Sequence, residues 1–122
     1  MANPNGRKGS SFERLEADYF KEHWPDGAAE FIDRQVKVGS RDVGDLANVR
    51  LGKHKIAVEL KNVKSMNLAG WLKEAQDEAA NLDAIAGIVV HKRVKHGQPG
   101  EQYLTMTVDD LINIIHAARS EL

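Results

Sequence analysis

The chain contains no cysteine, so it can form neither disulfides nor thiolate zinc sites, and a reducing cytoplasm is its expected compartment. No apolar run approaches the roughly 18 residues that a membrane span requires. The N-terminus has no hydrophobic signal-peptide segment, so export by that route is not expected. The histidines form no H-x-x-x-H helical pair, so a histidine metal site is not expected either. These absences favour a soluble cytoplasmic protein that does not depend on zinc.

The length and composition are those of a small globular protein. The chain has 122 residues, of which 42% are hydrophobic and 29% are charged, so one domain with a modest core is expected. Residues 1–9 are polar and contain Pro4, Gly6 and Gly9, which predicts a flexible N-terminal arm ahead of a single domain at 10–122. The net charge of −1 neither favours nor opposes a polyanionic partner, but basic residues gather in the predicted β region, where they could bind a phosphate backbone.

The segment Lys55–Lys61 is predicted to be the central strand. Its alternation places Ile56, Val58 and Leu60 in a core and puts Glu59 and Lys61 together on the other face. Charges on a central strand lose hydration and persist where they pair, bind a metal or take part in chemistry. With Asp45 on the preceding strand, the set predicts a Mg²⁺-type site of carboxylate oxygens, with the lysine beside a phosphate's developing charge.

The remaining pattern predicts an α/β fold, a mixed β-sheet flanked by helices. A capping box, Ser10-x-x-Glu13, predicts the start of a first helix that ends before Trp24. The tight turn at 52–54 implies an antiparallel hairpin, and the run after the second helix suits a buried strand reached by a crossover. The predicted strands are 34–38, 46–51, 56–61, 85–91 and 103–106. A second helix is predicted at 67–82, capped by Asn67. A last helix is capped by Thr107 and has an apolar stripe of Val108, Leu111, Ile112 and Ile115.

The chain resembles the PD-(D/E)xK nuclease superfamily, whose restriction-endonuclease-like core has the order α-β-β-β-α-β. The resemblance rests on Gly44-Asp45 followed by Glu59-Leu60-Lys61, which is the only [DE]-x-K triplet in the chain that lies on an apolar strand after a hairpin. Gly9, followed four residues later by Glu13-Arg14, is similar to the first-helix signature of archaeal Holliday-junction resolvases. The stretches around Trp71, 91–93 and 103–107 are similar to small resolvase-like nucleases of actinobacterial phages.

This resemblance implies a set of catalytic residues. It implies metal ligation by Asp45 and Glu59, with a further carboxylate from Glu13. Lys61 would orient or activate the attacking water, and Gln76 on the second helix would support the site. The implied cofactor is Mg²⁺ or Mn²⁺. Three alternatives stay open: Glu13 could serve only the capping box, Glu16 could replace it from the inward stripe of the first helix, and Asp42 is a weaker candidate for the place of Asp45.

The predicted function is a metal-dependent DNA endonuclease, of the Holliday-junction resolvase type. Symmetric cutting of a four-way junction needs two sites, so a homodimer is expected, with the last helix and Trp71 as candidate apolar surface. The location would be the host cytoplasm if the protein is phage-encoded. A RecB-type exonuclease or flap nuclease acting on single-stranded ends is an alternative, and a non-catalytic DNA-binding module is another. The candidate DNA contacts are Arg7, Lys8, Arg41, Lys64, Lys92 and Arg93.

Overall fold

The computed structural model describes residues 4–37 and 39–121, without the side chains of residues 4–7. Within these ranges no helix combines the length and the apolar character needed to cross a membrane. The elements are α1 (Pro4–His23), η1 (Ala29–Phe31), β1 (Asp33–Arg34), β2 (Leu46–Ala47), β3 (Arg50–Leu51), β4 (His54–Lys61), α2 (Leu68–Leu82), β5 (Ala86–His91), η2 (Pro99–Glu101), β6 (Tyr103–Thr105) and α3 (Val108–Ser120).

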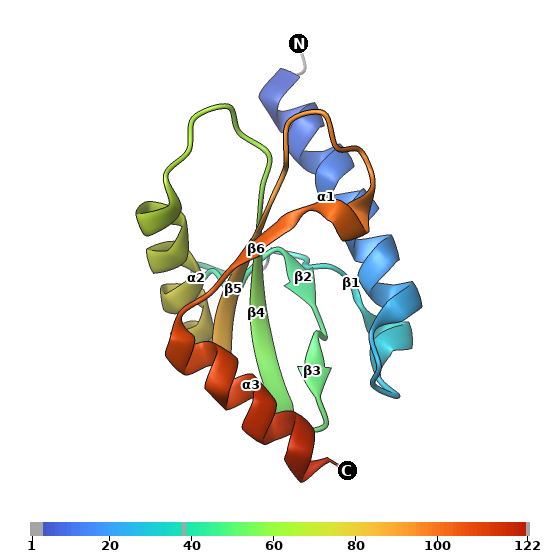
Figure 1. Cartoon of the computed structure of the whole chain (residues 1–122), viewed down its shortest axis with the longest axis vertical. Helices are drawn as coiled ribbons and strands as arrows, with labels where there is room; N and C mark the ends of the chain where they lie inside the picture. The colour runs from blue at the N-terminus through green and yellow to red at the C-terminus, as the bar shows by residue number, and fades with distance from the viewer. Residues whose placement is uncertain (1–3, 38, 122) are drawn as a thin grey trace.

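A mixed sheet with the strand order β3-β4-β5-β6 forms the centre of the molecule. Strands β4 and β5 run parallel, in a register from Ile56 opposite Ala86 to Lys61 opposite His91, and α2 is the crossover between them. Strand β3 pairs with β4 in an antiparallel hairpin, and β6 pairs antiparallel with β5. Strands β1 and β2 form a separate two-stranded ladder. The predicted α/β class, the hairpin and the crossover are therefore confirmed (Figure 1).

The two faces of β4 pack against different helices. Ile56, Val58 and Leu60 are buried in the larger hydrophobic cluster, which includes Phe12 of α1. The intervening residues of β4 face α2, whose Trp71 forms a smaller cluster with Ala75 and Val89. In Figure 1 the ribbons of α1 and α2 accordingly stand on opposite sides of the central strands. The predicted alternation along β4 is confirmed, and Glu59 lies between the sheet and α2.

Local side-chain bonds define where α2 and α3 begin. The Asn67 side chain accepts a hydrogen bond from the Gly70 amide at 3.2 Å, and the Thr107 hydroxyl accepts one from the Asp110 amide at 3.1 Å. Each bond satisfies an amide that has no partner within the helix. Both predicted caps are therefore confirmed. The predicted ends of α1 and α2 also agree with the structure, whereas the predicted start of α1 does not.

Three predicted boundaries are wrong. Helix α1 begins at Pro4, so residues 4–9 are helical and Ser10 lies inside the helix, where a capping box cannot form. Where the strand 34–38 was predicted, the described residues show only the short strand Asp33–Arg34, and residue 38 lies outside the described residues. The strand predicted at 46–51 is divided into β2 and β3, because Asn48 adopts a positive φ of 68° that breaks the extended conformation.

Candidate metal centre

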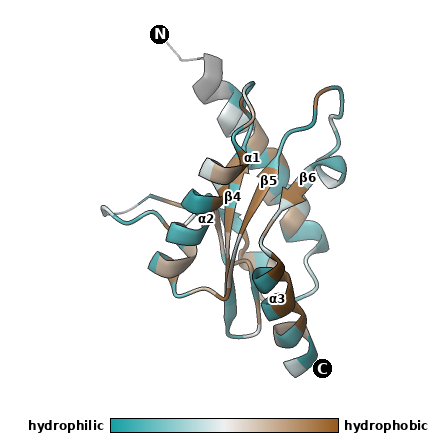
Figure 2. Cartoon of the chain, turned by 60° about the vertical axis from the view of Figure 1, so that its left-hand side comes forward, coloured by the Kyte–Doolittle hydropathy of each residue, from teal (hydrophilic) through white to brown (hydrophobic). Residues whose placement is uncertain are grey.

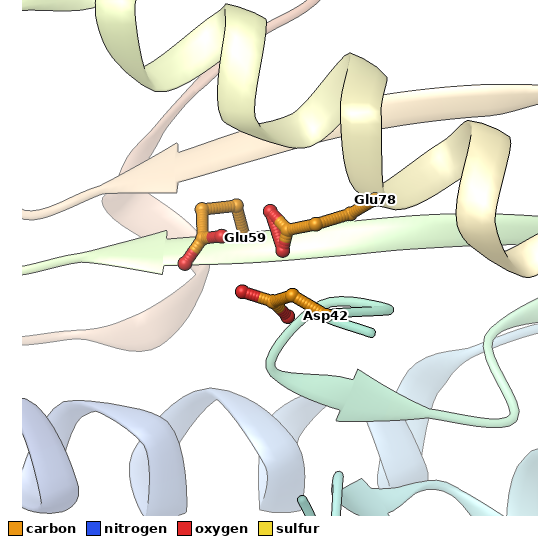
Figure 3. Close-up of side chains that lie close together, drawn as sticks. All are labelled: Asp42, Glu59 and Glu78. Carbon is orange, nitrogen blue, oxygen red and sulfur yellow. The ribbon is translucent and has the colours of Figure 1, made fainter. Parts of the chain in front are cut away.

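Three carboxylates converge between the sheet and α2. One oxygen each from Asp42, Glu59 and Glu78 lies within 4.8 Å of the others, and this is the only such group of histidine, aspartate or glutamate side chains in the described part of the chain. Asp42 comes from the loop before β2, Glu59 from β4 and Glu78 from α2, and Figure 3 shows the three side chains pointing toward one another. The cluster therefore joins three segments that are distant in sequence.

Two of these carboxylates are buried and form no ion pair with a described residue. Glu59 is 6% exposed and Glu78 is 2% exposed. Neither oxygen of Glu78 accepts a hydrogen bond from a described donor. Burial raises the pKa of both carboxyl groups, and the proximity of Asp45 and Glu78 raises the pKa of Glu59 further. Such an arrangement is stable only if a proton or a cation sits among the oxygens.

The donor set fits a hard divalent cation. All the groups are carboxylate oxygens, which Mg²⁺, Mn²⁺ and Ca²⁺ prefer, whereas a softer metal would call for sulfur or imidazole. Both oxygens of Glu78 lack a described hydrogen-bond donor, so both are able to coordinate a cation. Asp42 is exposed and opens the cluster to solvent, which leaves room for the waters that Mg²⁺ retains. A metal-binding role for this cluster is thus chemically consistent.

The Asp42 loop is held in place by hydrogen bonds from two directions. The Asp42 side chain accepts from the Gly44 amide at 3.0 Å, and the Asp42 carbonyl accepts from the Asn81 side chain of α2 at 2.8 Å. Gly44 has a φ of 104°, and a Cβ there would lie 3.0 Å from the Val58 carbonyl oxygen of β4. Glycine at position 44 therefore lets the loop approach the central strand closely.

Asp45 lies beside this cluster, but the three-residue group does not include it. One of its carboxylate oxygens accepts a hydrogen bond from the Leu60 amide at 2.8 Å, and the other is 3.5 Å from the Lys37 ammonium. Asp45 therefore lies near Glu59, as predicted, but it is not one of the three grouped carboxylates. The residue that completes the described group is Asp42, the weaker sequence candidate.

Two lysines supply positive charge near the acids. Lys61 lies 3.0 Å from Glu74 on α2. Burial tends to lower the pKa of Lys61, but Glu74 and Glu59 outweigh it, so the pKa is raised and the ammonium stays charged. Burial likewise tends to lower the pKa of Lys37, but Asp45 and Asp42 outweigh it and raise the pKa. The sequence analysis predicted Lys61 but did not assign Lys37 to the site, because it placed residue 37 on the strand predicted at 34–38.

The structure does not bring Glu13 into the cluster. A carboxylate oxygen of Glu13 is 3.2 Å from the Arg34 guanidinium, in a partly exposed ion pair. Its competitor Glu16 is 1% exposed and has an orphaned oxygen, and burial raises its pKa to about 7. Glu16 makes no ion pair with a described residue and is not part of the carboxylate group. Neither acid of α1 therefore acts as a ligand in this geometry.

Gln76 contacts a different part of the fold from Glu78. Its amide donates to an Asp110 oxygen at 2.7 Å and to the Gly87 carbonyl at 3.4 Å. Residues two positions apart on a helix point in different directions, so Gln76 and Glu78 cannot face the same site. The contacts of Gln76 tie α2 to α3, in place of the predicted supporting role.

Four of the six predicted DNA contacts line one surface pocket of about 240 Å³: Lys8, Lys64, Lys92 and Arg93. Lys92 donates to the Arg93 and His96 carbonyls, and Arg93 donates to the Glu101 carbonyl, so these two side chains also hold the 92–103 loop. Arg41 lies apart, in a cavity of about 490 Å³ that Lys37 and Asp42 also line. The side chain of Arg7 lies outside the described residues.

Sequence reasoning missed Glu78, although a signal was present. Residues 75, 78, 79 and 82 lie at positions i, i+3, i+4 and i+7, so Glu78 falls within the apolar stripe of α2. An acid in such a stripe points to a buried ionisable group.

Comparison with protein-family models, with curated proteins and with solved structures gave no match.

Proposed function

We propose that this protein is a divalent-metal-dependent nuclease that hydrolyses phosphodiester bonds in DNA, with branched DNA such as a four-way junction as its substrate. The observation that carries the proposal is the pair of buried carboxylates, Glu59 and Glu78, with Lys61 two residues after Glu59 on the same strand. Among the described residues, none donates a hydrogen bond to Glu78. A fold that needed only to bind DNA would gain nothing from burying two acids together, because their repulsion opposes folding.

Each residue has a distinct role in this proposal. Asp42, Glu59 and Glu78 would hold Mg²⁺ or Mn²⁺, which when bound supplies Lewis acidity and lowers the pKa of a coordinated water. Asp45 orients the end of β4, because its carboxylate accepts a hydrogen bond from the amide of Leu60, the residue after Glu59. Lys61 remains protonated and provides a positive charge for the scissile phosphate, where charge develops during hydrolysis.

The position of the basic pocket supports a role in binding the DNA backbone. Residues 62–64 directly follow β4, and residues 92–94 directly follow β5, so the pocket is at the carboxyl end of the parallel pair. Ligands of open α/β sheets bind at this end. Lys61 is the last residue of β4 and therefore faces the same edge. A DNA strand that contacts Lys8 and Lys64 would run toward the carboxylates.

Two other functions make different predictions. An exonuclease or flap nuclease would use the same acids but require a free end, and a binding module would not need the acids at all. Incubation of the protein with four-way junction, single-stranded and linear duplex DNA, each with Mg²⁺ or EDTA, distinguishes them. Paired symmetric nicks in the junction, with Mg²⁺ only, are the expected result. Degradation only from ends would favour the exonuclease, and binding without any cleavage would contradict the nuclease proposal.

The matched variants are Glu59→Gln and Asp77→Asn. Glu59→Gln keeps the shape of the side chain but removes the charge, so we expect cleavage to fall by at least about 100-fold, within the range that an electrostatic catalytic group supplies, while junction binding is retained. Asp77 is on α2, exposed, and paired only with Lys73, so its neutralisation should leave cleavage unchanged. Full turnover by Glu59→Gln would remove this carboxylate from the mechanism.

A further inference from the structure

Helix α3 turns its most hydrophobic side away from the protein. Val108 is 74% exposed, Leu111 and Ile112 are each 46% exposed, and Ile115 is 50% exposed. The side that packs on the fold carries Asp110 and Ala117, which are buried. Figure 2 shows hydrophobic segments along α3 at the surface of the molecule. The predicted apolar stripe therefore exists, but it does not pack on the sheet.

Single exposed hydrophobic residues are ordinary, but four on one stripe are not. Positions 108, 111, 112 and 115 follow the i, i+3, i+4, i+7 spacing of one helix face. A continuous apolar stripe in water loses the free energy that burial would supply, and on small soluble proteins such surfaces mark interaction sites. Trp71, the other predicted contributor, is only 7% exposed and is part of the core. Trp71 therefore does not contribute to this surface.

The charges that flank the stripe are complementary to those of a second, reversed copy. Asp109 lies in the first turn of α3, and Arg119 lies in the last turn. When two such helices pack antiparallel about a two-fold axis, the acidic end of each meets the basic end of the other. Asp109 and Arg119 make no ion pair with any described residue, so both are available.

We infer that α3 is a homodimer interface, in which the stripe of one copy packs antiparallel against the stripe of the other. Leu111, Ile112 and Ile115 form the apolar centre, and Asp109 and Arg119 pair across both ends. The inference stands on the exposed face and does not depend on the nuclease proposal. If the substrate is a four-way junction, the same two-fold axis would supply the second cleavage site.

Sedimentation equilibrium measures the dimer and the effect of a substitution at its centre. The wild type should sediment as a dimer at micromolar concentration. Ile112→Asp should weaken dimerisation by at least about 30-fold, the size of an interface hot spot, without lowering the melting temperature of the monomer, because residue 112 is already solvent-exposed there. Met66→Asp is the control, since Met66 is 66% exposed but lies outside α3. A monomeric wild type, or a dimer that Ile112→Asp does not weaken, would overturn the inference.

A charge-reversal pair tests the antiparallel arrangement. In the antiparallel homodimer, residue 109 of each copy meets residue 119 of the other. Asp109→Arg therefore brings two positive side chains together at both ends, and Arg119→Asp brings two negative side chains together. Each variant alone should be predominantly monomeric. Mixed in equal amounts, they should form a heterodimer, because both end pairs are then complementary. If the mixture stays monomeric, the helices do not pack antiparallel. Because Glu59→Gln should leave the dimer intact, loss of cleavage and loss of dimerisation are separate outcomes.

Discussion

Glu16 and Glu78 are acids that the fold buries without giving every oxygen a donor. In both cases burial raises the pKa, because the charged form loses its hydration. The likeness ends there, since Glu78 has two further acids beside it and Glu16 stands outside the carboxylate group. Only Glu78 therefore has neighbours with which it could share a cation.

Glu16 makes stability depend on pH. Its pKa in the folded protein is about 7, above the ordinary value of 4.5, so between these values the folded state holds a proton that the unfolded state has lost. The contribution of Glu16 to stability therefore falls as the pH rises from about 4.5 to about 7. Relative to Glu16→Gln, the wild type should lose about 3 kcal/mol of unfolding free energy across this range.

Urea unfolding at a series of pH values in EDTA measures this difference. Glu22→Gln is a suitable control, because Glu22 is an exposed acid on the same helix. Its pH profile should run parallel to that of the wild type. Parallel profiles for the wild type and Glu16→Gln would show that residue 16 does not titrate in this window.

At the residue scale, the sequence predicts best where a role follows from local pattern. Glu59 and Lys61 were found because strand alternation determines which face they occupy. Glu13 and Gln76 were misplaced because their partners, Arg34 and Asp110, come from distant segments that no local pattern relates to them. Asp42 was ranked below Asp45 for the same reason.

At the scale of elements, β5 approaches the backbone of α2 closely at Gly87. A Cβ on Gly87 would collide with the Ala75 carbonyl oxygen, which belongs to the helix backbone and cannot move independently. The Gly87 amide also donates to a buried Asp110 oxygen at 2.9 Å, and this bond attaches α3 to the same point. One glycine therefore determines how closely two helices pack on the central strands.

Gly87→Ala should destabilise the protein by about 3 kcal/mol or more, because overpacking a core displaces backbone. The matched control is Gly27→Ala, where a Cβ would meet nothing within 4 Å. Thermal unfolding of both variants, followed by circular dichroism, measures the effect. Equal melting temperatures would mean that α2 can withdraw from β5 at little cost.

The elements also show where pattern reasoning is sufficient. The starts of α2 and α3 were predicted closely, because their caps are bonds between residues three positions apart. The N-terminus of α1 was not, since the Ser10 pattern lies within a longer helix. The stripe of α3 was read correctly as a helix face, but periodicity cannot tell whether a face packs inward or outward.

At the scale of the whole molecule, a bound divalent ion should act as a stabiliser. The ion would offset the repulsion among Asp42, Glu59 and Glu78, and the unfolded chain holds these acids far apart. At 100 times its dissociation constant, a ligand specific for the folded state adds about 2.7 kcal/mol to the unfolding free energy. For a chain of this size, that corresponds to a rise of roughly 10 °C in melting temperature.

Differential scanning calorimetry with Mn²⁺, Mg²⁺ or EDTA measures this rise. Glu78→Gln should abolish it, and in EDTA at pH 8 the same variant should melt above the wild type, because a buried charge has been removed. Asp77→Asn should behave like the wild type in every buffer. An ion-dependent rise that survives in Glu78→Gln would place the bound ion elsewhere.

Because the three acids come from separate segments, a cut in the chain can divide the cluster between two fragments. A break in the connection between β4 and α2 would leave Asp42 and Glu59 on one polypeptide and Glu78 on the other. Neither fragment would carry a complete coordination set, and each would expose one side of the parallel pairing of β4 with β5. A divalent ion would then cross-link the two fragments and promote their complementation. The cluster would thus make the assembly of a split protein depend on metal.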